Sequence, residues 1–147
     1  MNSTDARKSR INERLKDYWL GLGKGGKLPL ESDVHVEDLK DIWDYCFLIT
    51  IHHGKFSYSY LGESLIEAYG DDVTGKEITE TLLYPHPQSL LKAFREVAAS
   101  GQPGEDDSEF VNSRGATVKY RSCVLPLAAT SGGKTAFLLG GMKWKAY

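Results

Sequence analysis

The segment 56–76, FSYSYLGESLIEAYGDDVTGK, constrains the fold strongly because its pattern changes from strand to helix within a few residues. Aromatic residues alternate with serines at 56–60, which is typical of a half-buried β-strand. Gly62 then opens a short helix that ends at Gly70, a residue suited to the left-handed helix cap. Thr74-Gly75 marks a further turn. The segment predicts a strand that turns directly into a short helix.

The remaining sequence predicts four more strands and three more helices. The strand at 45–51 is apolar on both faces, so we expect it to lie in the middle of a sheet, as we do for 135–144. Five strands with helices inserted after the second describe an α+β domain. The expected strands are 45–51, 56–61, 109–112, 117–127 and 135–144. The expected helices are 5–22, 36–43, 62–69 and 89–100, with a helical turn at 77–83 and a solvated acidic loop at 105–107.

Size and charge exclude several classes of protein. A chain of 147 residues is one domain by length. Its formal net charge of −2 favours no nucleic acid or anionic membrane as a partner. The N-terminus has no signal-peptide pattern, and no apolar run approaches the ~18 residues of a membrane span. We therefore expect a cytoplasmic protein that binds neither nucleic acid nor membrane.

Short motifs follow one another along the chain: Trp19 with Leu28-Pro29, Phe56 to Gly62, Tyr69-Gly70, Thr74-Gly75-Lys76, Gly101-Gln-Pro103 and Leu125-Pro126-Leu127. Their order and spacing together resemble the PAS superfamily over roughly residues 15–145, and the resemblance is nearest to small stand-alone bacterial PAS proteins. The resemblance implies a five-stranded antiparallel sheet in the order 2-1-5-4-3 with helices on one face. The two strands expected to be central agree with that order.

The N-terminal part, 1–30, is expected to be a helical extension and linker ahead of a PAS-like domain at 31–147. One apolar stripe runs along its helix, which leaves three interpretations: a cover for the sheet, a dimer contact or a docking site for a partner. We favour a cover that also contributes to a dimer, since the first strand needs cover on its outer side. The stripe consists of Ile11, Leu15, Tyr18, Trp19 and Leu22.

Tyrosines mark the place where a small molecule could bind. Tyr58, Tyr60 and Tyr69, with Phe94 on the following helix, are expected to line a space between sheet and helices. Tyrosine combines an apolar ring with one hydrogen-bonding hydroxyl, which suits a ligand cavity. An ordinary packed core is the alternative. Arg121 could bind an acidic ligand, or it could simply be an exposed strand residue.

Several other motifs lack the context that their chemistry needs. The glycines of 21–26 and 132–135 resemble phosphate-binding loops, but neither set lies between a strand and a helix. His52 and His53 are adjacent turn residues with no third ligand nearby, so we expect no metal site. Cys46 and Cys123 are expected two strands apart, ~9.6 Å, beyond the ~7 Å limit of a disulfide. Both should be reduced core residues.

We expect no cofactor. Some PAS domains hold haem through a histidine on the helix before the third strand, whereas His86 lies ahead of that helix. Flavin-photosensing PAS domains carry a reactive cysteine in an Asn-Cys-Arg-Phe run, which this sequence lacks. The resemblance therefore implies neither a haem nor a flavin sensor.

The expected function is that of a stand-alone sensory and signal-transduction module, because we expect no output domain beside the PAS-like region. Such a module would act through protein–protein interaction, as a homodimer with an unidentified signalling protein, and it could hold a small-molecule ligand. One alternative is a small-molecule enzyme of the isomerase or hydratase kind on a curved sheet. The alternation of strands one, two, four and five places no acid or histidine inward for that chemistry. The other alternative is a purely structural dimerisation module.

Overall fold

The computed structural model describes residues 3–23, 25–79 and 87–147. Its elements follow the expected order, helix, two strands, helices and three strands. The main elements are α1 Ser3–Leu22, β1 Cys46–His52, β2 Lys55–Leu61, α2 Glu63–Tyr69, α3 Pro87–Ser100, β3 Gly104–Val111, β4 Thr117–Ala128 and β5 Thr135–Ala146.

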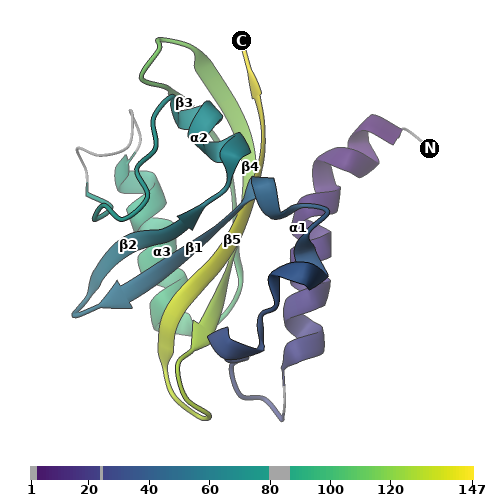
Figure 1. The fold of residues 1–147 in the computed structure, drawn as a ribbon, viewed down its shortest axis with the longest axis vertical. Coiled ribbons are helices and arrows are strands. Elements are labelled where there is room, and N and C mark those ends of the chain that lie inside the picture. The colour runs from purple at the N-terminus through teal and green to yellow at the C-terminus, as the bar shows by residue number, and fades with distance from the viewer. Residues whose placement is uncertain (1–2, 24, 80–86) are drawn as a thin grey trace.

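The five strands form one antiparallel sheet in the order β2-β1-β5-β4-β3 (Figure 1). The expected fold and strand order are confirmed. β5 lies at the centre, where it pairs with β1 on one side and with β4 along almost its whole length on the other. β2 and β3 are the edge strands.

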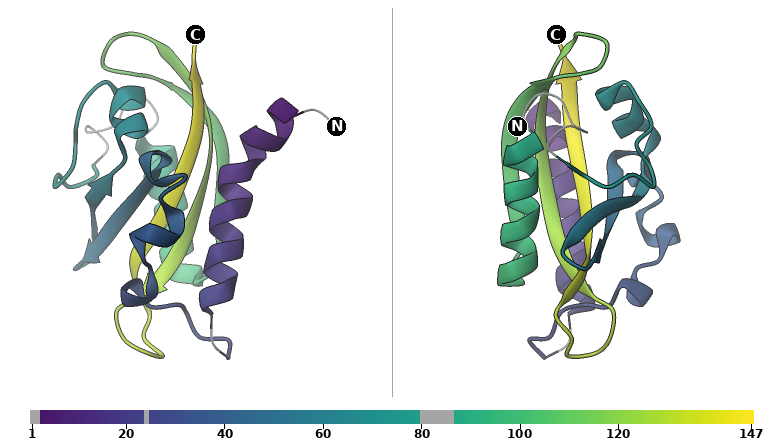
Figure 2. Two further views of the ribbon diagram at one scale, coloured as in Figure 1. Left: turned by 45° about the vertical axis from the view of Figure 1, so that its right-hand side comes forward. Right: turned by 90° about the vertical axis from the view of Figure 1, so that its left-hand side faces the viewer.

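Helices cover both faces of this sheet. α2 and α3 pack on one face, which we call the inner face, and α1 packs across β4 and β5 on the other, the outer face (Figures 1 and 2). Three short 3₁₀ turns lie beside α1 and complete the outer cover; they span Glu31–Asp33, Val36–Leu39 and Trp43–Tyr45. Each face has its own hydrophobic cluster.

Two adjacent glycines in β5 allow both faces to pack closely. A Cβ atom added to Gly140 would fall within the ring of Phe47 on the inner face. A Cβ atom added to Gly141 would lie 2.5 Å from Leu15 Cδ1 and 2.9 Å from Ile11 Cγ2 on the outer face. The central strand therefore has bare backbone where the inner core and α1 approach it.

Three expected elements differ from the structure. Residues 36–43 form 3₁₀ turns in place of one helix. The expected acidic loop at 105–107 is wrong, because these residues belong to β3, an edge strand whose outward positions can carry charge without desolvating it. Of the expected helical turn at 77–83, Glu77 instead forms a β-bridge with Ser57, and residues 80–83 lie outside the described residues.

Candidate functional site

Aromatic side chains fill the inner face between the sheet and the two helices. Tyr58 and Phe94 are 0% and 1% exposed, and Phe94 lies 6.0 Å from Phe47, ring centre to ring centre. Tyr69, from the last turn of α2, packs its ring 6.4 Å from that of Tyr58. We call this set the inner aromatic cluster: Phe47, Phe56, Tyr58, Tyr69, Phe94, Phe110 and Tyr120.

The two buried tyrosines of this cluster meet at their hydroxyls. Tyr58 Oη and Tyr69 Oη lie 3.3 Å apart and share a hydrogen bond. Tyr69 is held in place from the far side because the side chain of Asn112 donates a hydrogen bond to the Ala68 carbonyl, 3.0 Å away. Burial raises the pKa of both phenols, so both stay protonated and remain hydrogen-bond donors at neutral pH.

A third inward hydroxyl, that of Tyr120, lies nearer the edge of the sheet. Tyr120 Oη donates a hydrogen bond to Asp106 Oδ2, 2.7 Å away on β3. Burial first, and then the neighbouring carboxylate of Asp106, raises the pKa of Tyr120. The inner face thus combines an apolar aromatic surface with three protonated phenols, the composition expected of a ligand-binding wall or of a packed core.

Tyr60 is not part of this cluster, contrary to the sequence-based expectation. The β1–β2 register shifts between Leu48, which pairs with Tyr60, and Ile49, which pairs with Tyr58. The extra residue, Ser59, turns Tyr60 to the outer face. There it stacks on Trp43 at 4.6 Å and donates a hydrogen bond to the Trp43 carbonyl. The strict aromatic–serine alternation of this strand hides the bulge from sequence analysis.

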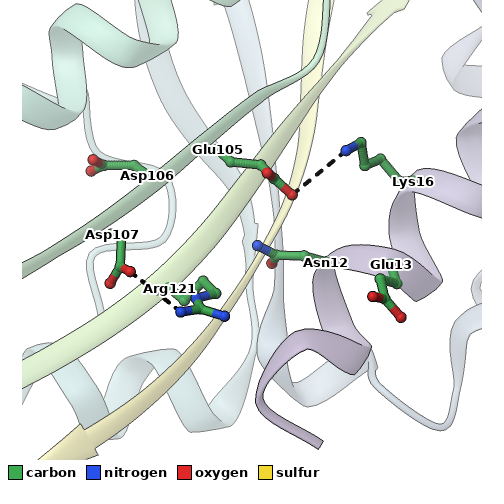
Figure 3. Close-up of a pocket in the computed structure, with 7 residues that line it drawn as sticks. All are labelled: Asn12, Glu13, Lys16, Glu105, Asp106, Asp107 and Arg121. Atoms are coloured by element: carbon green, nitrogen blue, oxygen red, sulfur yellow. Dashed lines mark hydrogen bonds and ion pairs between the residues drawn. The ribbon is translucent and has the colours of Figure 1, made fainter. Parts of the chain in front are cut away.

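Arg121 also lies away from the inner face. It projects from β4 on the outer side, where its guanidinium is 3.5 Å from the Asp107 carboxylate on β3. Together with residues of α1 it lines a polar cleft at the edge of the sheet (Figure 3). The sequence-based candidates therefore divide between two places: Tyr58, Tyr69 and Phe94 inside, Tyr60 and Arg121 outside. Ligand binding by any of them stays a prediction.

The apolar stripe of α1 covers the outer face. Ile11 and Leu15 are buried against β5, and Trp19 Nε1 donates a hydrogen bond to the Pro126 carbonyl, 2.7 Å away on β4. Tyr18 Oη donates to Asp38 Oδ2 at 2.9 Å, and Leu22 is half-buried. The stripe thus acts as a cover for its own sheet, and its predicted role in a dimer is not tested by these contacts.

Asn12 was missed in the sequence. It lies three residues before Leu15 and seven before Trp19, and so on the same helix face as that apolar stripe. It is 4% exposed, and its side-chain amide donates to the Ser122 carbonyl, 3.3 Å away on β4. A polar residue inside an apolar helical stripe was the signal available to find it.

The cysteines and histidines of the described residues do not gather into a group that could hold a metal ion. No group of three metal-ligating side chains occurs within 3–23, 25–79 and 87–147. Cys46 and Cys123 are free and buried in the outer cluster, on either side of Gly141. His52 and His53 are exposed in the β1–β2 turn. His86 lies outside the described residues. A separate finding is that no helix in the described part of the chain has the length and apolar character to cross a membrane.

The family comparison agrees with the architecture. The model of the family described as "PAS domain" matches residues 7–143, from α1 to β5. No curated protein sequence matches the chain at a significant level. The chain belongs to the PAS domain family. Proteins of this class are sensory signalling modules, and this chain is one of them.

Solved structures of light-oxygen-voltage domains share the fold at low sequence identity. A structure described as a light-oxygen-voltage domain studied with a flavin analogue has a TM-score of 0.60 at 15% identity, covering 75% of this chain and 83% of the other. The dark structure of the blue-light photoreceptor Aureochrome1 has 0.57 at 16%, covering 78% and 86%. A fungal light-oxygen-voltage photoreceptor has 0.56 at 14%, covering 97% and 99%. These likenesses concern the fold.

In flavin-photosensing PAS domains, as the resemblance above implies, a cysteine of an Asn-Cys-Arg-Phe run reacts with the flavin, and this chain lacks that run. A flavin held between the sheet and the helices would need such a thiol on the inner face. Both cysteines here face the outer cluster, and burial raises the pKa of both thiols, that of Cys123 to about 12. The described inner face carries no thiol, so its residues do not fit a flavin of that photochemical kind.

Proposed function

We propose that this PAS domain senses a small molecule at the inner aromatic cluster and transmits the signal by protein–protein contact through α1. The observation that carries the proposal is the packing at Gly140 and Gly141, two adjacent residues of the central strand. Phe47 of the inner cluster rests on the first glycine, and Leu15 of α1 rests on the second. A displacement of the inner ring would reach α1 through one peptide unit, since neither glycine has a side chain to absorb it.

The Tyr58–Tyr69 hydroxyl pair supports a ligand with a hydrogen-bond acceptor. One hydrogen bond between two hydroxyls uses only one of their two protons. The other proton has no acceptor within the described residues, and both groups are fully buried phenols that stay neutral. A carbonyl or ether oxygen on an otherwise apolar molecule would accept it. We therefore propose an uncharged, mostly apolar ligand, not a flavin or a haem.

A homodimer is the form that we propose for the signalling protein. Among the structures with the same fold is one described as the light-state dimer of the fungal photoreceptor Vivid, at a TM-score of 0.52 and 10% identity. In this chain Ile11 and Leu15 are occupied by the sheet, so a dimer contact would use the solvent side of α1. Leu20, 63% exposed, is an apolar residue available for it among the described side chains of α1.

Native mass spectrometry of the protein purified from its own host tests both parts. We expect a dimer mass and a co-purified small molecule that is lost in Tyr69→Phe. Tyr60→Phe is the matched control, since it removes a phenol from the outer face of β2, the strand whose inner face carries Tyr58. A monomer without any bound molecule, together with no thermal shift across a panel of small apolar compounds, would contradict the proposal.

The proposal includes the absence of enzymatic activity. Asp106, a carboxylate at the inner face, accepts a hydrogen bond from the Tyr120 hydroxyl at the edge of the sheet, and the raised pKa of Tyr120 keeps this phenol protonated at neutral pH, so it has no lone negative charge with which to act as a general base. We also propose a cytoplasmic location and an as yet unidentified signalling partner.

A further inference from the structure

A polar cleft lies on the outer face, between the middle of α1 and the edge of the sheet at β3 and β4 (Figure 3). Its volume is about 460 Å³, within the range of small-molecule sites. It is separate from the inner aromatic cluster, which lies on the opposite face. The side chains that matter here are Asn12, Glu13 and Lys16 of α1 and Glu105, Asp107 and Arg121 of the strands.

Asn12 forms the buried part of this cleft and is only half satisfied. Its Nδ2 donates to the Ser122 carbonyl at 3.3 Å, which sets the orientation of the amide, because a flipped amide would place two acceptors against each other. Its Oδ1 is buried and has no hydrogen-bond partner within the described residues. A buried acceptor without a donor costs free energy. A group that donates an N–H or O–H hydrogen bond to Asn12 Oδ1 would remove this cost.

The ion pairs on either side of Asn12 are loose. Lys16 Nζ lies 3.7 Å from Glu105, and the Arg121 guanidinium lies 3.5 Å from Asp107. All four side chains are well exposed, between 42% and 71%. Exposed pairs of this kind contribute little to stability, so a competing cation can replace Lys16 or Arg121 beside its carboxylate without a large loss.

The charge of the cleft is negative. Glu13, Glu105 and Asp107 contribute three carboxylates against two cations, Lys16 and Arg121, while the carboxylate of Asp106 points to the inner face and bonds Tyr120. Glu13 makes no ion pair in the described part of the chain. An anionic ligand would meet an excess of carboxylates, and no group of three metal ligands is present among the described residues. The ligand favoured by this arrangement is a cation with several N–H donors.

We propose that the cleft binds a guanidinium group. A guanidinium presents five N–H donors in a plane, so one edge can bond a carboxylate such as Glu105 in a bidentate manner while another N–H reaches Asn12 Oδ1. The ammonium of a lysine is compact, with three donors and no planar edge. It therefore matches the separate acceptors of Glu105 and Asn12 less well. The guanidinium can belong to a free metabolite or to an arginine of another protein.

Amide NMR of the full-length ¹⁵N-labelled protein tests the proposal. The probes are agmatine, as a free guanidinium compound, and the peptide acetyl-Gly-Arg-Gly-amide, as a protein arginine. Citrulline replaces the guanidinium by a neutral urea of similar shape and serves as the negative control. We expect the Asn12 side-chain signals to shift in a saturable manner with agmatine or the peptide, and not with citrulline. Binding of agmatine indicates a metabolite, and binding of the peptide alone indicates a protein partner.

Charge-neutral variants locate the binding. Glu105→Gln should weaken the affinity about tenfold, the loss expected for one charge-assisted hydrogen bond. Glu109→Gln is the matched control, because Glu109 is an exposed carboxylate on β3 outside the cleft, and it should change the affinity less than twofold. Asn12→Leu should also abolish the saturable shifts of neighbouring amides, with folding verified by thermal unfolding.

Three results would overturn the inference. The first is an absence of saturable shifts at millimolar agmatine and peptide. The second is equal weakening by Glu105→Gln and Glu109→Gln, which would mean a general attraction to an acidic strand. The third is binding of citrulline with the same affinity as the guanidinium compounds, which would mean that the cleft does not recognise the guanidinium group. Because Glu105 and Glu109 are surface residues, these outcomes do not depend on the stability of the Asn12 variant.

Discussion

The inner and outer faces of the sheet are both buried, but different contacts close them. On the inner face aromatic rings pack against one another, and two helices hold them. On the outer face aliphatic side chains, chiefly Leu15, fill the space above Gly141, and hydrogen bonds attach the rest of α1. Trp19 bonds to Pro126, and Tyr18 bonds to Asp38.

This difference suggests how the domain opens. The inner aromatic cluster joins residues of four strands and two helices, so exposing all of it requires more of the domain to move than exposing the outer face does. The outer cover depends on one helix and on the turns beside it, a smaller number of apolar contacts. We infer that α1 leaves the sheet before the inner face opens, as a signalling element must.

The largest effect is expected from removing one buried side chain on each face. Phe94→Ala should lower the free energy of unfolding by about 4 kcal/mol and Leu15→Ala by about 3 kcal/mol, the range for large cavities. Urea unfolding measures both. Leu15→Ala should also increase the rate at which Cys123, beneath α1, reacts with a thiol reagent under native conditions, more than Phe94→Ala does. The reverse order of reaction rates would contradict the separate opening of α1.

Substitution of the two central glycines by alanine should lower the free energy of unfolding by different amounts. Gly140→Ala should destabilise by about 3 kcal/mol, since its methyl group meets the buried ring of Phe47. Gly141→Ala should cost about 1 kcal/mol, because the end of the Leu15 side chain can move. Thermal and urea unfolding test this order, with Gly21→Ala as the control. Gly21 is exposed in α1 with no neighbour near its added methyl group, so alanine should stabilise by up to about 1 kcal/mol.

Alkaline pH should weaken the outer face through its thiols. Burial raises the pKa of Cys123 from 9.0 to about 12, so the folded state keeps a proton that the unfolded state releases. The stabilising contribution is therefore complete below pH 9 and is lost as pH rises from 9 towards 12, at about 1.4 kcal/mol per pH unit. Cys123→Ala should show a correspondingly shallower decline in urea unfolding between pH 9 and 10. An identical slope in both proteins would show that this thiol is not shielded.

The smallest effect concerns one hydrogen bond at the end of α1. Trp19→Phe removes the indole N–H that bonds to the Pro126 carbonyl while retaining an aromatic ring. We expect a loss of about 1 kcal/mol in urea unfolding and faster hydrogen exchange confined to α1. Tyr60→Phe, which removes a hydrogen bond to the Trp43 carbonyl elsewhere on the outer face, should leave the exchange of α1 unchanged. Equal effects on α1 from both variants would mean that the outer cover behaves as one unit.

Much of the fold could be predicted because local patterns specify it. The apolar faces of β1 and β5 marked them as central strands, and Gly70 marked the end of α2, where it adopts the left-handed conformation. The charged run at 105–107 was misjudged as a loop, since an edge strand tolerates charge on its exposed positions. Tyr60 was misplaced because a bulge reverses the alternation beyond it.

The sequence by itself determined the class of protein, the order of its elements and the inward position of Tyr58, Tyr69 and Phe94. These properties depend on the periodicity of apolar residues and on turn residues, both of which are local features of the sequence. Only the tertiary structure decided that Asn12 of α1 meets Glu105 and Arg121 in one cleft. That juxtaposition depends on how closely a helix approaches a sheet, and on this domain the bare backbone of β5 sets that distance.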